Sequence, residues 1–185
     1  MPTKDPGTDK KSLREKLFGQ PRPVIDLPRT SLDNMLEALA LLGLITPVYY
    51  LIKVWPHLPE RFPIHFGING VPDAWGGRGS LLPLLFISLF PYVLLTVLSF
   101  FPQTYNYPVE ITPDNAERQY RLARGLILWL KFELAWLFGY IQWFTIQVAM
   151  GNASGLGIWL TPVVLATVFG TLGVYLWKSF RQRRT

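Results

Sequence analysis

Four long apolar stretches constrain this chain more than any other feature of its sequence. They cover Met35 to Trp55, Leu81 to Phe101, a stretch that ends near Met150, and Ile158 to Trp177. Each holds about the 20 predominantly apolar residues needed to cross a hydrocarbon core roughly 30 Å thick. Half of all residues are hydrophobic and only 16% are charged, a balance typical of membrane proteins. We therefore predict an all-α integral membrane protein with four transmembrane helices.

The distribution of Lys and Arg predicts the orientation of these helices. Seven such residues lie in 1–34, three in 102–124 and four in 178–185, against two in 56–80 and none in 151–157. Both termini should therefore face the cytoplasm, in what we expect to be a prokaryotic plasma membrane. Basic segments beside an anionic leaflet account for the net charge of +6, so nucleic acid is not an expected partner.

These features divide the chain into five segments. The polar, Pro-rich start does not resemble a cleaved signal peptide, and residues 8–18 predict either a short helix on the inner membrane surface or a mobile tail. The absence of cysteine excludes disulfides and thiolate sites. The segments are a basic cytoplasmic N-terminal segment (1–30), a two-span unit (31–101), a cytoplasmic connection and helix (102–124), the third and fourth spans (125–177) and a basic cytoplasmic tail (178–185).

The outer loop, residues 56–80, is the long polar segment between two apolar ones. Asn69-Gly70 is a strong hairpin signal, because a type I′ turn needs two residues that tolerate positive φ. Pro63 and Pro72 lack a backbone N–H, so any strand here should lie at an edge. We predict a short structured hairpin or ordered loop outside the cell.

Two kinds of chemistry fit this loop. His57, His65 and Asp73 are spaced by eight and are possible metal ligands, and Glu60 or Asp73 with His65 would suit acid–base catalysis. The spacing matches no compact ligand motif, so the leading interpretation includes no metal, cofactor or catalytic residue. A simpler reading has Asp73 capping a turn, Trp75 anchoring at the interface and Arg78 contacting headgroups.

The third span carries polar residues at heptad spacing. Its helix is expected to begin at Thr112-Pro113 and to continue through Met150. Glu133 is the acid that lies clearly within a span, which makes it a candidate for transport or proton transfer as an alternative to packing. The tryptophans of one face are Trp129, Trp136 and Trp143, and the polar residues of the next are Glu133, Tyr140 and Gln147.

The fourth span has a face of small residues. Ala166, Gly170 and Gly173 lie on successive turns beside Thr167 and Thr171, which predicts close helix packing. A homodimer seam on this face is the alternative.

The loop sequence LPERFPIHFGINGVPDAW resembles the DUF1648 family of small integral membrane proteins, whose mark is LPxxIPxHxxxxGxxDxWGxK. Phe62 replaces the usual Ile, and Arg78 stands close to the usual Lys. The resemblance implies a relation to immunity and signalling proteins that act against a sporulation-delaying peptide toxin and sequester a cytoplasmic repressor. The positions that match are Leu58, Pro59, Pro63, His65, Gly70, Asp73, Trp75 and Gly76.

Together these observations predict a non-enzymatic membrane protein. Its outer loop would recognise a peptide, toxin or envelope component, with a role in immunity or in signalling to a cytoplasmic protein partner. The alternatives are a membrane enzyme with a loop metal or acid–base site and a small transporter subunit that uses Glu133. The expected ligand-binding residues are His65, Gly70, Asp73, Trp75 and Arg78.

Overall fold

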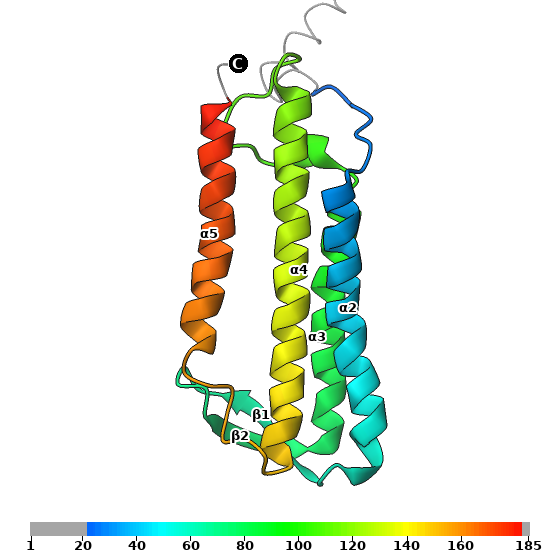
Figure 1. Ribbon diagram of the computed structural model, residues 1–185, viewed down its shortest axis with the longest axis vertical. Helices are drawn as coiled ribbons and strands as arrows, with labels where there is room; N and C mark the ends of the chain where they lie inside the picture. The colour runs from blue at the N-terminus through cyan, green and yellow to red at the C-terminus, as the bar shows by residue number, and fades with distance from the viewer. Residues whose placement is uncertain (1–21, 183–185) are drawn as a thin grey trace, which may run out of the picture.

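The computed structural model describes residues 22–182, in which four long helices lie beside one β-hairpin (Figure 1). The short helix expected over residues 8–18 lies outside the described residues. The long helices are α2 (Ser31–Val54), α3 (Leu81–Leu98), α4 (Ala116–Ala149) and α5 (Leu160–Arg181); the strands are β1 (Arg61–Phe66) and β2 (Pro72–Gly77); the 3-10 turns are η1 (Trp55–His57), η2 (Arg78–Ser80) and η3 (Pro102–Thr104).

Helix α4 occupies the middle of the molecule and packs against α2, α3 and α5, whereas α2 and α3 contact each other little. Figure 1 shows the start of α2 and the end of α5 at one end of the bundle, with the hairpin at the other. The connection between α4 and α5 lies beside the hairpin. The long helix α4 therefore joins the two ends of the molecule.

Three helical segments in residues 22–182 are long and apolar enough to cross a membrane. They are α2 with η1, η2 with α3, and α5, with mean hydropathies of 1.8, 2.4 and 1.7. Large apolar side chains such as Phe86 and Phe169 are exposed on the isolated chain, as lipid-facing side chains would be. The chain is therefore a mostly helical, multi-pass membrane protein, and its bilayer environment follows from these helices.

Helix α2 begins at Ser31 because Thr30 and Asp33 form a capping box. The Thr30 hydroxyl accepts from the Asp33 backbone N–H at 3.1 Å, and the Asp33 carboxylate accepts from the Thr30 backbone N–H at 3.0 Å. Two N–H groups that would otherwise lack a partner are thereby satisfied. Thr30 is therefore the N-cap of α2.

Helix α4 begins later than expected. The expected start at Thr112-Pro113 is wrong, because α4 begins at Ala116. The Asn115 side chain accepts from the Thr112 backbone N–H at 2.9 Å and donates to the Glu110 carbonyl at 2.9 Å, which stabilises a turn before the helix. An Asn side chain that bonds nearby backbone competes with helix formation, and this accounts for the difference.

The small-residue face of α5 does not pack closely within the chain, which corrects the expectation for Gly170 and Gly173. A Cβ added at either glycine would meet no atom within 4 Å. Polar contacts instead connect α5 to α4. Gln119 and Ser179 are both fully buried and exchange two hydrogen bonds, of 3.1 and 2.6 Å.

Candidate functional site

The hairpin is anchored in the helix bundle by Phe62. This side chain is fully buried and belongs to a cluster with Leu51, Leu58, Leu81 and Ile146. The cluster joins strand β1 to the ends of α2 and α4 and to the start of α3. The hairpin is therefore held on the bundle by a core of its own.

The turn between the strands differs from the expected type I′. Among the described residues only glycines have positive φ, so Asn69 does not; Gly70 has a φ of 76°. The Gly70 N–H donates to the Gly67 carbonyl at 2.8 Å, and the Gly67 N–H donates to the Val71 carbonyl at 2.9 Å. This pattern is a three-residue loop in which the glycine alone supplies the left-handed conformation. Asn69 instead accepts from the Val71 N–H through its side chain at 3.1 Å.

His65 and Asp73 form a pair on the surface of the hairpin. The His65 Nδ1 lies 2.6 Å from the Asp73 Oδ1, and the two side chains are 69% and 52% exposed. The strand register shifts on both sides of His65. Such irregularities re-aim side chains, and here the two residues meet across the strands. The pair can present both a hydrogen-bonding ring and a carboxylate to a ligand.

The remaining loop candidates, Trp75 and Arg78, have other partners. The Arg61 guanidinium lies 5.1 Å from the centre of the Trp75 ring. Arg78 pairs with Glu60 at 3.3 Å and lies 5.9 Å from the Trp55 ring. Within residues 22–182, no three or more His, Asp or Glu side chains gather as they would to hold a metal ion.

Several apolar side chains of the hairpin are exposed. Ile68, at the turn, is 87% exposed, and Trp75 is 41% exposed. Ile64 and Val71, at 53% and 48%, complete the group. Exposed apolar groups close to polar ones characterise recognition surfaces, and we call Ile64, Ile68, Val71 and Trp75 the apolar rim.

Gly70, a candidate for ligand binding, contacts the connection between α4 and α5 instead of standing free. Its carbonyl accepts from the Leu156 N–H at 2.8 Å. A Cβ at Gly70 would lie 2.9 Å from the Gly157 carbonyl oxygen, and a Cβ at Gly155 would lie 2.2 Å from the Gly70 carbonyl oxygen. The backbone of the two loops approaches so closely that side chains do not fit between them.

The three polar candidates of α4 have separate partners. Tyr140 donates to the Leu156 carbonyl at 2.8 Å, and Gln147 donates to the Tyr50 hydroxyl at 2.7 Å. Both side chains thus hold the hairpin end of the bundle together. Glu133 lies apart from them and accepts from the Thr171 hydroxyl at 2.5 Å.

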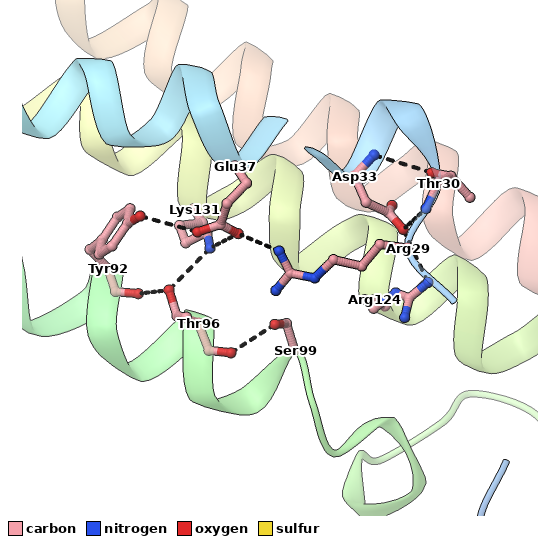
Figure 2. Close-up of polar contacts among 9 residues, drawn as sticks. All are labelled: Arg29, Thr30, Asp33, Glu37, Tyr92, Thr96, Ser99, Arg124 and Lys131. Carbon is pink, nitrogen blue, oxygen red and sulfur yellow. Dashed lines mark hydrogen bonds and ion pairs between the residues drawn. The ribbon is translucent and has the colours of Figure 1, made fainter. Parts of the chain in front are cut away.

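Sequence reasoning missed a buried ion pair between α4 and α2 (Figure 2). Lys131 is 1% exposed, and its Nζ donates to the Glu37 Oε2 at 2.5 Å and to the Thr96 hydroxyl at 3.0 Å. Tyr92 donates to the other Glu37 oxygen at 3.1 Å, and Arg29 lies 3.8 Å from this carboxylate. Glu37 is thus a further acid in the helix bundle besides Glu133. The signal in the sequence was a lysine in the apolar part of α4.

A second pair joins the same helices nearer the chain ends. The Arg124 guanidinium donates to the Asp33 carboxylate at 3.0 Å and to the carbonyls of Leu27 and Pro28 at 2.7 and 2.9 Å. Asp33 therefore serves both the capping box and α4. Figure 2 shows the two pairs side by side along α2.

Burial shifts the pKa of two tyrosines in the connection between α3 and α4. Burial raises the pKa of Tyr105 to about 12, and it also raises the pKa of Tyr107 well above the ordinary value. The Tyr105 hydroxyl donates to the Leu98 carbonyl at 2.5 Å, and the Tyr107 hydroxyl donates to the Pro102 carbonyl at 2.8 Å. Both rings are thus neutral anchors for this connection.

Comparison with known proteins identifies the part of the chain that carries the hairpin. Residues 42–89 match the family model described as "Domain of unknown function (DUF1648)". This segment is similar to the DUF1648 domain. It begins within α2, contains the whole hairpin and ends within α3. The resemblance predicted from the loop motif is confirmed, whereas the link to toxin immunity stays a prediction.

One relative extends the likeness beyond the DUF1648 domain. An "Uncharacterized protein" of Archaeoglobus fulgidus is 36% identical over 97 residues, which cover 48% of this chain and 50% of that protein. The chain thus matches about half the length of this curated relative. No solved structure matches the chain.

Proposed function

We propose that this protein crosses the membrane four times, with both ends cytoplasmic, and uses its hairpin outside the cell to bind a peptide such as a toxin. The protein would bind this peptide without converting it chemically. The observation that carries the proposal is the combination, on one anchored hairpin, of the exposed His65–Asp73 pair and the apolar rim.

The fourth span in this proposal is α4. With 34 residues at about 1.5 Å each, it is about 50 Å long, more than a hydrocarbon core requires. Its polarity is covered by neighbouring helices, since Lys131, Gln119 and Gln142 are all at most 2% exposed and have hydrogen-bond partners. Polar groups inside a membrane are tolerated in this way.

The hairpin offers two means of holding an extended peptide. In the described residues its two strands pair only with each other, so each has an edge without a strand partner, on which a peptide strand could add. The apolar rim would contact alternate side chains of that peptide, and the His65–Asp73 pair would bind a polar one. The Phe62 core and the Gly70–Leu156 hydrogen bond keep this surface ordered before binding, which lowers the entropic cost of association.

The same arrangement offers a route for a signal to the cytoplasm. Ile146 on α4 belongs to the hairpin core, and Arg124 on the same helix binds Asp33 near the chain ends. A displacement of the hairpin would therefore act on a helix that extends to the opposite face. We propose a cytoplasmic protein partner at that face.

The orientation is tested first. Because the chain contains no cysteine, single cysteines can be introduced at Ile68 and at Phe180, which is 52% exposed at the other end. An impermeant maleimide added to intact cells should label Ile68→Cys and not Phe180→Cys, and permeabilised cells should show both. Labelling of Phe180→Cys in intact cells would contradict the orientation.

The ligand is tested with a photoreactive amino acid at Ile68 in native membranes. We expect a discrete peptide adduct, identified by mass spectrometry, that weakens in an Asp73→Ala variant. The same photoreactive residue at Phe180 is the matched control. Absence of an adduct at Ile68, or an adduct unaffected by Asp73→Ala, would contradict recognition by the His65–Asp73 surface.

A further inference from the structure

A groove of about 670 Å³ lies between α4 and α5, at the end of the bundle where the chain ends lie. Its walls include Leu126 and Trp129 on α4 and Gly170 and Val174 on α5. The side chains leave this space open, because a Cβ at Gly125 or at Gly170 would meet nothing within 4 Å.

Two polar contacts connect α4 and α5 along this groove. The Gln119–Ser179 pair ties α5 to α4 near the chain ends, and the Glu133–Thr171 hydrogen bond ties them deeper in the bundle. Between these ties the two helices are spaced by an unfilled apolar gap. A bilayer does not leave such a gap empty, so a lipid chain or another helix must occupy it.

The polar atoms of the groove point to a ligand. Among the described residues, the buried side-chain nitrogen and oxygen atoms without a hydrogen-bond partner are the Arg124 Nε and the Glu133 Oε2. Both residues line this groove. Arg124 is only 8% exposed, so the unmade hydrogen bond of its buried Nε is costly. The free donor is a cation and favours an anionic acceptor.

The basic residues at the end of the groove nearest the chain ends, which we call its mouth, also favour an anionic ligand. Arg121, Arg124 and Lys178 all line the groove at this end. Asp33, which also lines it, is already engaged by Arg124 at 3.0 Å. Lys178 is exposed, and an anionic headgroup attracts such a cation at the membrane surface.

The dimensions fit a single acyl chain. Arg124 and Glu133 are nine residues apart on α4, so about 14 Å separates the mouth from the carboxyl that ends the apolar part. One leaflet contributes about half of a core roughly 30 Å thick, or about 15 Å.

We propose that this groove binds one anionic phospholipid of the inner leaflet. Its phosphate lies beside Arg124 and Lys178, and one acyl chain extends along Leu126, Trp129 and Gly170 towards Glu133. The bound lipid would maintain the spacing between α5 and α4. This inference rests on the four-span arrangement proposed above and not on the ligand of the hairpin.

The test measures which lipid the purified full-length protein retains. The protein in detergent is equilibrated with equal amounts of phosphatidylglycerol and phosphatidylcholine and analysed by native mass spectrometry. We expect one retained phosphatidylglycerol per chain, and a preference over phosphatidylcholine that Lys178→Gln lowers by about fivefold, the contribution of one cation near an anionic surface. Gly170→Leu should fill the groove and remove retention of either lipid.

Two matched variants serve as controls. Arg181→Gln removes a cation of the same helix end, and Gly173→Leu adds the same bulk at a glycine that also faces open space; neither residue lines the groove. Both should retain phosphatidylglycerol as the unmodified protein does. Equal retention of the two lipids, or equal effects of Gly170→Leu and Gly173→Leu, would overturn the proposal.

A dimer that only Gly170→Leu dissociates, with no lipid bound, would also overturn it and would assign the groove to a second copy. The cysteine-labelling experiment separates this failure from failure of the topology, because it reports the position of the two ends without any lipid ligand.

Discussion

The Lys131 ammonium lies 2.5 Å from the Glu37 carboxylate and joins α4 to α2 inside the helix bundle. The lysine side chain is 0% exposed and the glutamate side chain 22% exposed. A charge in such a place is stable only with its partner, because transfer of a lone ion out of water is costly. The two helices therefore depend on each other more than their apolar surfaces suggest.

Lys131→Met should destabilise the protein by about 3–5 kcal/mol, because it leaves the Glu37 carboxylate without its principal cation. The double variant Lys131→Met with Glu37→Met should recover most of the loss, since an apolar pair of similar size replaces a buried ion pair at little cost. Unfolding in mixed micelles, followed by circular dichroism, measures both. Lys53→Met, at an exposed lysine, is the control. A double variant no more stable than the single one would show that the pair does not act as a unit.

Phe62→Ala should cost about 3–5 kcal/mol, because it empties the core beneath the hairpin. Ile64→Ala, on the same strand but 53% exposed, should cost much less. The same unfolding measurement compares the two variants. Similar losses would mean that Phe62 does not anchor the hairpin.

Gly155→Ala should separate the hairpin turn from the connection between α4 and α5, because the new Cβ would lie 2.2 Å from the Gly70 carbonyl oxygen. We expect a loss of about 1–3 kcal/mol, typical of overpacking. Hydrogen exchange at the Leu156 amide should become faster, since its bond to Gly70 opens. The matched control is Gly79→Ala, where a Cβ meets nothing within 4 Å. Unchanged protection of Leu156 in Gly155→Ala would rule out this contact.

The free energy of unfolding should fall as the pH rises from 10.0, the ordinary pKa of tyrosine, through about 12, the pKa of Tyr105 in the folded protein. In this window the folded chain keeps a proton that the unfolded chain has lost, so raising the pH favours unfolding. Below pH 10 the contribution is fully present. Tyr105→Phe should flatten the slope and, since it removes the hydrogen bond to Leu98, lower stability at neutral pH by about 1 kcal/mol. Equal slopes in both proteins would exclude Tyr105 as the titrating group.

Those parts of the fold that depend on local sequence could be predicted. The apolar windows around α2, α3 and α5 predicted helices because length and hydropathy are local properties. The hairpin was also placed around Gly70. The turn type was wrong, because a type I′ turn and the observed three-residue loop share the Asn-Gly signal, and only the backbone distinguishes them.

The polar interior could not be predicted, because its partners are far apart in the sequence. Lys131 and Glu37 are separated by 94 residues, and Arg124 and Asp33 by 91. Each residue alone has an ordinary local explanation, as a basic residue near the inner face or an acid near a helix start. Only the packing of α4 against α2 makes them pairs.

The burial of Lys131 has a consequence for biosynthesis. In the proposed four-span arrangement, α2 and α3 emerge from the ribosome first and are apolar enough to enter the bilayer. At that stage Glu37 has not yet paired with the Lys131 ammonium. Helix α4 is less apolar, and it carries the lysine that Glu37 lacks. We therefore expect α4 to stay at the insertion machinery until α2 and α3 receive it, so that the ion pair sets the order in which the chain leaves the translocon.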